Sequence, residues 1–272
     1  MIGFPEWYKI PAVKFKIIKY TYNREVMFIK PSFSKGEGKS TRMIRIHNVS
    51  HLDVWMNSMR IFESRRLYNL YYSLAKYKEG IPYGSLNLAE RDFGNWSRDN
   101  WKEIKEFDFL LDIDCNNHKE IDFAYYSAKE IKKFFDGLGV PYHLRFSGRG
   151  FHFVIPYDYF ESYHLSFDPH DEKNIYQFYM DIAVELQKRF SEMIDIGIYD
   201  LRRVVKIPYS LALYDDIEYL CRPFENDDDF NGFKLNNMCP MHSMFRIREM
   251  YENLFNSNGN VFKLIKELGL KG

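Results

Sequence analysis

The sequence predicts an α+β protein, and two features carry that prediction. Residues 107–155 run in the order strand, helix, hairpin, and a hairpin returns the chain antiparallel to itself. Amphipathic segments, with apolar residues at three- and four-residue spacings, lie on both sides of this stretch. We therefore expect a mainly antiparallel sheet with helices packed on it.

The first hundred residues predict a mixed α/β module. Alternating apolar and polar residues over 11–30 predict a hairpin of two strands. From 50 to 78 the apolar residues recur at helical spacing, which predicts one long helix or two. We expect the stretch from 82 to 101 to be mostly irregular.

Beyond residue 100 the pattern is clearer. The expected elements are a strand at 107–114, a helix at 121–137, strands at 140–146 and 151–155, a helix at 174–190, a strand at 201–207, and helices at 243–256 and 260–269. Gly137 and Gly139 supply the stop of the first helix. The last two helices form a predicted C-terminal helical tail.

Composition limits the class of protein. At 272 residues the chain is long enough for one large domain. Its 38 basic and 38 acidic residues balance, so it is not a polycation that coats nucleic acid indiscriminately. Three spread cysteines do not form a disulfide framework, and we find neither a signal peptide nor a membrane-spanning run. We expect a cytoplasmic protein.

Two carboxylates end an apolar, aromatic-rich strand. Side chains alternate between faces along a strand, so Asp112 and Asp114 project to the same side. Two nearby carboxylates repel each other unless a cation or shared protons intervene. A divalent metal is the simplest solution. The alternative is a strand that runs out into a polar loop.

A glycine-rich turn, Ser147-Gly148-Arg149-Gly150, follows about one helix later and leads to His152. The glycines allow a tight turn and let a ligand approach the backbone amides. Hydroxyl, guanidinium and imidazole groups suit an anionic oxygen, so phosphate is the natural ligand. The alternatives are an ordinary hairpin connection and, for the histidine, a satisfied buried side chain.

A third polar stretch follows the helix predicted at 174–190. Its charged residues are Asp195, Asp200, Arg202, Arg203 and Lys206. Asp195 offers a third carboxylate, and the basic residues offer positive charge. The alternative is an edge strand kept soluble by Lys and Arg. For Asp200, directly before the strand, we predict a role in a turn.

Together, and in this order, the three stretches resemble the archaeo-eukaryotic primase superfamily, also called primase-polymerases, and in particular its catalytic small subunits. The family pattern is an Asp-x-Asp at a strand end, a Ser-Gly-rich turn ending in His, and an Asp followed by a basic strand with Pro and Ser. Residues 109–114, 146–152 and 195–210 match these three parts. The resemblance covers roughly residues 100–215, with weaker likeness on either side.

The resemblance implies a fold and a function. Residues 101–272 would be an RRM-like catalytic module with C-terminal helices, compact with the module 1–100. Its activity would be two-metal nucleotidyl transfer that synthesises or extends primers on single-stranded DNA. Asp112, Asp114 and Asp195 would hold two Mg²⁺ or Mn²⁺ ions. The nucleotide-binding residues would be Ser147, Gly148, Arg149, His152, Arg203 and Lys206.

The match has departures. Ala212 occupies a position where family members often have a His. The N-terminal Arg that reaches phosphates in relatives could be Arg42 or Arg45, within the basic stretch 30–45. Structural Zn²⁺ is a further option, since Cys115-Asn-Asn-His118 and Cys239-Pro-Met-His242 have ligand-pair spacing and Cys221 is a third candidate. We favour three ordinary thiols instead.

Other functions and several partners stay open at this stage. A gap-filling or end-joining repair polymerase would extend primers without starting them. A non-catalytic nucleic-acid-binding subunit or a metal-dependent nuclease are the rivals from other classes. Expected partners are template and primer DNA, nucleoside triphosphates, and either a large primase subunit or other replication and mobile-element proteins. Such a protein would associate with the nucleoid in a prokaryotic or viral setting. No membrane partner is expected.

Overall fold

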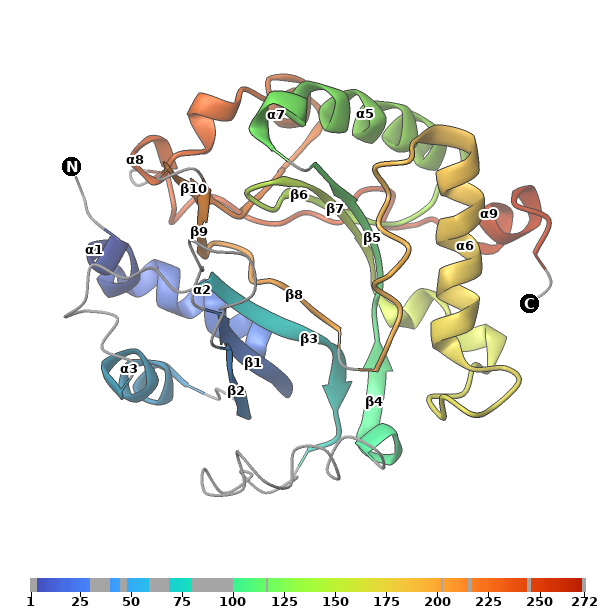
Figure 1. The fold of residues 1–272 in the computed structure, drawn as a ribbon, viewed down its shortest axis with the longest axis horizontal. Coiled ribbons are helices and arrows are strands. Elements are labelled where there is room, and N and C mark those ends of the chain that lie inside the picture. Colours follow the sequence, from blue (N-terminus) through green and yellow to red (C-terminus); the bar gives the residue numbers. More distant parts are fainter. Residues whose placement is uncertain are drawn as a thin grey trace.

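The computed structural model describes residues 4–29, 40–44, 48–58, 69–79, 100–115, 117–201, 203–214, 217–243 and 246–270. The protein is α+β, and its strands form three antiparallel sheets within these ranges (Figure 1). We call the five-stranded sheet A and the four-stranded sheet B; the third is a two-stranded ribbon. None of the described helices is long and apolar enough to cross a membrane.

Sheet A has the strand order β2-β1-β3-β4, and β8 also pairs with β3. Its strands are β1 (Arg24–Ile29), β2 (Ser40–Ile44), β3 (Asn69–Tyr77), β4 (Ile104–Phe107) and β8 (Val204–Lys206). The helices α1 (Phe4–Lys9), α2 (Pro11–Thr21) and α3 (Val49–Ser58) lie beside it (Figure 1). Since β4 and β8 lie beyond residue 100, the sheet is completed by the second part of the chain.

The hairpin predicted over 11–30 is wrong in its first half, because residues 11–21 form α2. Val13, Ile17 and Thr21 are buried at a four-residue spacing, which is the period of a helix. Phe15, which the alternating pattern placed on the same side as Val13 and Ile17, is 67% exposed. Pro11 suits the first turn of a helix, where its missing N–H costs nothing. Only the second predicted strand exists, as β1.

The helical prediction for 50–78 is confirmed for α3 but wrong for β3. Leu70 and Leu74 have helical spacing, yet Tyr72 between them is equally buried. Strand β3 pairs with β1 on one side and with β4 and β8 on the other. A central strand that is buried on both faces loses the alternation by which strands are recognised.

Sheet B has the strand order β11-β6-β7-β5. Its strands are β5 (Phe109–Asp114), β6 (His143–Phe146), β7 (Gly150–Ile155) and β11 (Arg222–Pro223), and its helices are α5 (Ile121–Leu138) and α6 (Ile175–Phe190). The strand, helix and hairpin predicted between 107 and 155 are confirmed, as is the helix predicted at 174–190. Gly139, with φ +70°, ends α5.

The two faces of sheet B differ in kind. On one face the rings of Phe109 and Phe153 pack against Tyr179 of α6 and Phe135 of α5. Both helices therefore cover this face (Figure 1). The opposite face is directed towards sheet A, where Arg145 Nη2 donates a hydrogen bond to Tyr72 Oη over 3.0 Å. Polar groups of sheet B thus lie between the two sheets.

The chain passes from sheet A to sheet B at Asp108, between β4 and β5. This carboxylate is buried, forms an ion pair with Arg24 of β1, and accepts a hydrogen bond from the Tyr157 amide over 3.1 Å. The predicted strand 107–114 is therefore β5 plus the last residue of β4. The ion pair fixes Asp108 at the passage between the two sheets, because a buried carboxylate without a partner would lower the stability of the fold.

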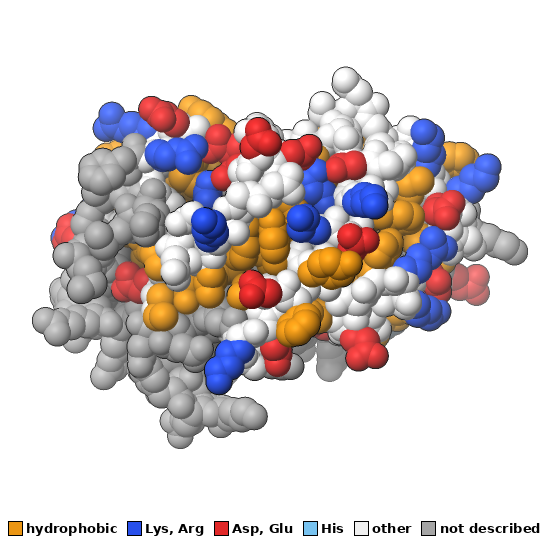
Figure 2. Space-filling model, turned by 90° about the horizontal axis from the view of Figure 1, so that it is seen from above, with side chains coloured by type: hydrophobic (Ala, Val, Ile, Leu, Met, Phe, Trp, Pro, Cys, Tyr) orange, Lys and Arg blue, Asp and Glu red, His pale blue; other side chains and the backbone are white. Residues whose placement is uncertain are grey.

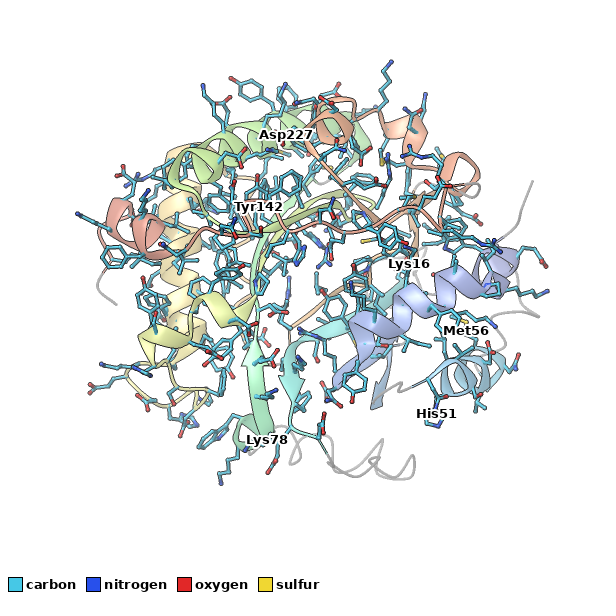
Figure 3. The ribbon with its side chains drawn as sticks, turned by 180° about the vertical axis from the view of Figure 1, so that it is seen from behind. Lys16, His51, Met56, Lys78, Tyr142 and Asp227 are labelled. Carbon is cyan, nitrogen blue, oxygen red and sulfur yellow. The ribbon has the colours of Figure 1, made fainter. Side chains whose placement is uncertain are left out.

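The last third of the chain contains elements that the pattern did not predict. They are β9 (Leu211–Tyr214), β10 (Ile217–Leu220), η6 (Leu235–Met238), α7 (Asp227–Asn231) and α8 (Pro240–Ser243). The helix predicted at 260–269 is confirmed as α9 (Phe262–Glu267). Residues 246–256 form turns and an extended segment instead of the predicted helix. There Phe255 pairs with Tyr142, and the Met250 carbonyl accepts a hydrogen bond from Lys16. Tyr142 and Lys16 are labelled in Figure 3. These long-range contacts override the helical spacing.

Candidate active site

A row of charged and polar side chains crosses the inner face of sheet B. Asp112 of β5 lies opposite His152 of β7, which in turn lies opposite Arg145 of β6. On the other side of β5, the Asp195 amide donates to the Asp112 carbonyl over 2.9 Å, and Ile194 bridges Ile113. Register therefore places Asp195, Asp112, His152 and Arg145 side by side on one face.

Asp114 belongs to the next row of the same face. It lies opposite Gly150, the last residue of the glycine-rich turn. Its carboxylate accepts a hydrogen bond from Arg149 Nε over 2.7 Å and forms an ion pair with Arg149 Nη2. The three sequence stretches that were singled out thus come together between the two sheets.

Each of the three acids faces one basic group. Asp114 pairs with Arg149, His152 Nε2 lies 3.4 Å from Asp112 Oδ1, and Arg203 Nη2 lies 3.4 Å from Asp195 Oδ2. The same basic groups are the ones expected to bind phosphates. Charges of both signs therefore balance within the site, which avoids the repulsion expected between neighbouring carboxylates.

The glycine-rich turn closes as a tight hairpin between β6 and β7. The Ser147 amide donates to the Gly150 carbonyl over 2.9 Å, and Ser147 Oγ accepts from the Gly150 amide over 3.1 Å. Gly148 has φ +105°, a conformation that other residues rarely adopt. A Cβ at Gly150 would lie 1.9 Å from the Ile113 carbonyl oxygen of β5. Glycine is required there because the two backbones approach so closely.

Cys115 holds the turn against β5. Its Sγ donates to the Arg149 carbonyl over 2.7 Å, and its side chain is buried. Burial raises the pKa of the Cys115 thiol to about 11, so the protonated donor form is the stable one at neutral pH. This thiol therefore positions the residue that carries the Arg149 guanidinium.

Asp112 and His152 form the buried centre of the row. Burial raises the pKa of Asp112, but His152, Arg203 and Arg149 together outweigh it and lower the pKa. Burial lowers the pKa of His152, and Arg145 and Arg203 lower it further, against the opposing effect of Asp112. We therefore expect an ionised carboxylate beside a neutral imidazole at neutral pH.

Lys206 of β8 contributes from sheet A. It pairs with Tyr71 of β3, and its Nζ lies 5.0 Å from the centre of that ring. Only 4% of Lys206 is exposed, and its Nζ has no hydrogen-bond partner in the described part of the chain. Burial lowers its pKa to about 7, with a smaller contribution from Arg149. A buried cation without an acceptor is costly unless a ligand supplies one.

Four further orphaned polar atoms lie in or beside this site. The described residues offer no hydrogen-bond partner to Asp112 Oδ1, His152 Nδ1, Arg145 Nε or Arg203 Nε, although all four atoms are buried. Buried polar atoms are normally satisfied, so such a group indicates an unfilled requirement for a ligand, an ion or water. Their clustering along one face supports a binding site.

Asp112, Asp114 and Asp195 are of the ligand type that a hard divalent cation prefers. They offer carboxylate oxygens from neighbouring backbone positions, and Asp112 Oδ1 is buried without a hydrogen bond. As the side chains stand, no three His, Cys, Asp or Glu within the described ranges converge closely enough to hold a metal. The cause is the pairing described above, since each acid turns towards its own basic group.

The remaining expected residues fall in several places. Ala212 is buried in β9, opposite Tyr219 of β10. Arg45 and Arg202 lie outside the described residues, as do most of the basic stretch 30–45 and the side chains of Arg42, His118 and His242. The two candidate zinc pairs are therefore described only at their cysteines. Burial raises the pKa of Cys221 to about 12, which favours an ordinary thiol.

Sequence reasoning missed Arg145, the most buried guanidinium of the site. It is 1% exposed, lies opposite His152, and its Nη1 is 3.6 Å from the buried carboxylate of Glu252. A signal was available, since a charged residue alternating with Leu144 and Phe146 must point to the other face of the strand. Glu252 carried no comparable signal, because its partner is distant in sequence.

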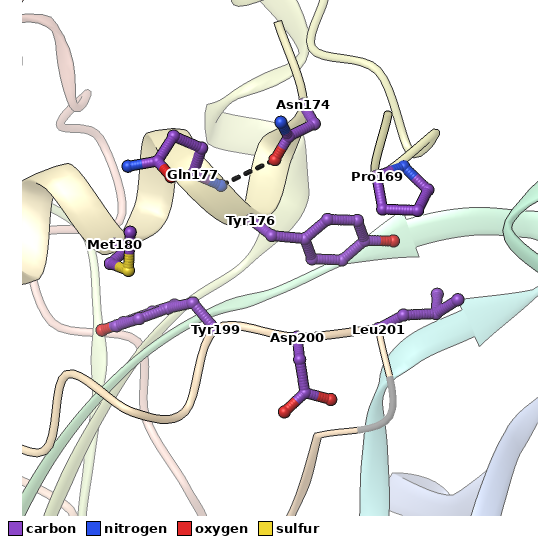
Figure 4. A pocket seen from close by; sticks show the side chains of 8 residues that line it. All are labelled: Pro169, Asn174, Tyr176, Gln177, Met180, Tyr199, Asp200 and Leu201. Atoms are coloured by element: carbon purple, nitrogen blue, oxygen red, sulfur yellow. Dashed lines mark hydrogen bonds between the residues drawn. The ribbon is translucent and has the colours of Figure 1, made fainter. Parts of the chain in front are cut away.

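A separate cavity of about 600 Å³ lies beside the loop that follows Asp195 (Figure 4). Tyr176 of α6 and Tyr199 of the loop contribute to its walls, and Tyr199 Oη donates to the Leu110 carbonyl of β5 over 2.6 Å. Asp200 is its one charged lining residue. The Arg203 amide donates to the Asp200 carbonyl over 3.1 Å, so Asp200 lies in a turn. This cavity does not suit phosphate.

Comparison with known proteins adds no assignment: no protein-family model matches the chain, and no curated protein matches it significantly.

Proposed function

We propose that the protein is a template-directed nucleotidyl transferase of the primase-polymerase type, which synthesises or extends primers on single-stranded DNA. One observation carries the proposal. The three stretches that resemble the family meet in space: the three carboxylates and the glycine-rich turn lie on neighbouring backbone of sheet B, Arg203 lies 3.4 Å from Asp195, and Lys206 contributes from sheet A. An accidental resemblance in sequence would not require these residues to meet.

The arrangement of sheet B supports the RRM-like part of the proposal. Along the chain, β5, α5, β6, β7 and α6 are followed by the short segment 193–195. Across the sheet, that segment lies beside β5, then come β7 and β6, and both helices lie on one face. This order is consistent with a βαββαβ unit whose last strand is reduced to a single bridge, and in such a unit the sheet face opposite the helices is available for binding.

The basic residues would bind the triphosphate of the incoming nucleotide. Arg149 and Arg203 suit phosphate oxygens because a guanidinium presents several donors in one plane. Lys206 Nζ is buried without an acceptor, so it would gain a hydrogen bond when an anionic ligand enters. His152 would donate to a phosphate oxygen only when its Nδ1 carries a proton. Backbone amides of the glycine-rich turn lie close to the same place.

The three carboxylates would hold two Mg²⁺ or Mn²⁺ ions, which supply activation of the attacking hydroxyl and neutralisation of the leaving pyrophosphate. In exchange, Arg149 and Arg203 would leave the carboxylates and turn to the phosphates. The pairing seen in the structure would therefore keep both sets of charges neutralised until a nucleotide arrives.

The test is incubation of the purified protein with unprimed single-stranded DNA, Mn²⁺ and labelled nucleotides of each sugar type. We expect short template-dependent products, and a primed template in parallel reports extension. Extension without initiation would identify a repair-type polymerase of the same family. Cleavage of labelled DNA without nucleotides would support a nuclease. DNA binding with neither nucleotide incorporation nor cleavage would support a non-catalytic subunit.

The matched pair Asp195→Asn and Asp200→Asn makes this test specific. Both aspartates precede β8, but only Asp195 lies beside Asp112, whereas Asp200 is in the neighbouring turn. We expect Asp195→Asn to lose incorporation and Asp200→Asn to keep it. Equal activity of both variants would contradict the proposed role of the row.

A further inference from the structure

A second cavity lies on the far side of sheet B from the proposed active site. It has a volume of about 810 Å³ and lies between residues 159–164 and α9. Phe160, next to its lining residues, packs on Phe109 and Tyr179, which belong to the helix-covered face of the sheet. Helix α9 lies beside α6 in both ribbon views (Figures 1 and 3). The volume is typical of small-molecule sites.

The lining of this cavity is basic although the whole chain is neutral. Lys173, Lys266 and His164 contribute to it, and no Asp or Glu does. Neither lysine has an ion-pair partner among the residues that the structure describes. Glu267, the acidic residue of α9, is held by Arg189 of α6 through a 3.5 Å contact. Two lysines are therefore left to attract an anion.

The same lining offers aromatic surfaces. Tyr159, Tyr163 and Phe262 contribute rings, and Phe262 is 64% exposed, an unusual position for so large an apolar side chain. The Tyr163 hydroxyl is buried and makes no hydrogen bond within the described chain. An aromatic ligand with polar edges would cover the rings and satisfy this hydroxyl.

Backbone strain marks the same place. His164 has φ +49°, in the left-handed region that costs a non-glycine residue free energy. Such conformations persist where the surrounding structure fixes them, often at binding sites. Here His164 ends the short helical turn at Glu161–Tyr163 and begins the segment that leads to α6.

We propose that this cavity binds a nucleoside phosphate, with the base against Tyr163 and Phe262 and the phosphate at Lys173 and Lys266. The combination of rings, unpaired lysines and an orphaned hydroxyl fits a ligand that is aromatic at one end and anionic at the other. The ligand is either a free nucleotide or the phosphorylated end of a nucleic-acid strand. The site is distinct from the proposed active site, from which the sheet separates it.

The test is ligand-observed NMR titration of the full chain with AMP, adenosine and ribose 5-phosphate. We expect AMP to bind at least about tenfold more tightly than either fragment, because a charged hydrogen bond and ring stacking each contribute about that factor. No binding of AMP at millimolar concentration, or equal binding of adenosine, would overturn the proposal.

Three variants locate the binding. Lys173→Gln combined with Lys266→Gln should weaken AMP binding about tenfold or more. Lys263→Gln is the matched control, since Lys263 lies on the same helix but outside the lining, and it should bind as the parent does. Arg149→Gln combined with Lys206→Gln removes cations from the proposed active site, so the AMP binding that this variant retains reports the cavity alone. Loss of AMP binding in either of the last two variants would refute the location.

Tyr163→Phe tests the contact to the base, since it removes the hydroxyl and keeps the ring. We expect weaker binding of AMP and unchanged binding of ribose 5-phosphate; an equal effect on both would refute base recognition. Competition with a short oligothymidylate, with and without a 5′-phosphate, distinguishes the two sources of the ligand. If only the phosphorylated strand displaces AMP, the ligand of the cavity is a strand end. If neither strand displaces AMP, the ligand is a free nucleotide.

Discussion

The two faces of sheet B are built for opposite purposes. The face under α5 and α6 is filled by aromatic rings in contact with one another, such as Phe153 with Phe135. The face towards sheet A carries acids, a histidine and an arginine, and several of their buried atoms lack hydrogen bonds. The aromatic contacts of the first face stabilise the fold, whereas the unsatisfied polar atoms of the second destabilise it. Such a cost is expected where a ligand completes the structure.

The outer surface above α5 differs from both faces. There Lys and Arg side chains are interspersed with Asp and Glu (Figure 2). Such a mixed surface does not attract a polyanion as a single-sign patch does. The concentration of unpaired basic atoms inside the molecule is therefore a property of the inner face that the surface seen in Figure 2 does not share.

The largest expected effect separates function from stability on the inner face. Asp112→Asn and Asp114→Asn should each reduce nucleotide incorporation by about a thousandfold or more, since metal ligands contribute several kcal/mol to such reactions. Their stability should fall by far less than their activity, because each substitution removes only one charged contact, with His152 or with Arg149, and keeps the shape of the side chain. Primer extension and chemical denaturation measure the two effects. Near-normal nucleotide incorporation by either variant would contradict the two-metal proposal.

On the helix-covered face the expectation is reversed. Phe153 is fully buried and touches rings of α5 and of Tyr142. Phe153→Ala should lower the free energy of unfolding by about 3–5 kcal/mol through lost contacts and a cavity. Phe123→Ala is the control, because Phe123 is 69% exposed and its loss should cost little. A small effect of Phe153→Ala in denaturant titration would contradict the assignment of this face as core.

The two faces also differ in how far the sequence predicts them. Asp112, Asp114 and the glycine-rich turn were identified together because alternation along a strand and the chemistry of a turn are local properties. Arg145 could have been found by the same alternation. The partners Tyr72 and Glu252 could not, because they come from segments separated by more than seventy residues and are selected by packing alone.

The errors in secondary structure have the same origin. The patterns of residues 11–21 and 69–77 suit both a helix and a strand. Which of the two forms depends on packing against residues that are distant in the chain. Strand β3 is central to sheet A, whereas α2 lies at its side. The middle of the chain was predicted well because its helices, hairpin and caps are specified by nearby residues.

Substitution of Lys206 tests whether a buried charge on the inner face lowers the free energy of unfolding. Its pKa of about 7 lies below the value near 10.4 expected in the unfolded chain, so below pH 7 folding must bury a charge at full cost. That cost fades as pH rises from 7 towards 10. Lys206→Met should therefore raise the free energy of unfolding by a few kcal/mol at pH 6, on the order set by this shift, and hardly at all at pH 10. It should also weaken triphosphate binding.

Denaturation of both proteins at several pH values checks this expectation. The parent protein should gain stability between pH 7 and 10 relative to the variant, because its unfolded form binds the extra proton there. A pH-independent difference would show that packing of the longer side chain, and not its charge, sets the effect. Tyr71, whose ring lies under Nζ, should remain in place in either case.

The smallest expected effect concerns the backbone that joins the two faces. At Gly150 an added Cβ would lie 1.9 Å from the Ile113 carbonyl oxygen, so Gly150→Ala should force β7 away from β5 and destabilise by about 1–3 kcal/mol. Gly137→Ala is the matched control: its Cβ would meet no atom within 4 Å, and in a helix the change should stabilise by about 1 kcal/mol. Opposite signs for the two variants in thermal denaturation are the expected result. A neutral effect of Gly150→Ala would mean that β5, which carries Asp114, and the turn that carries Arg149 are less tightly joined than their hydrogen bonds require. The proposed positioning of the two residues would then lose its basis.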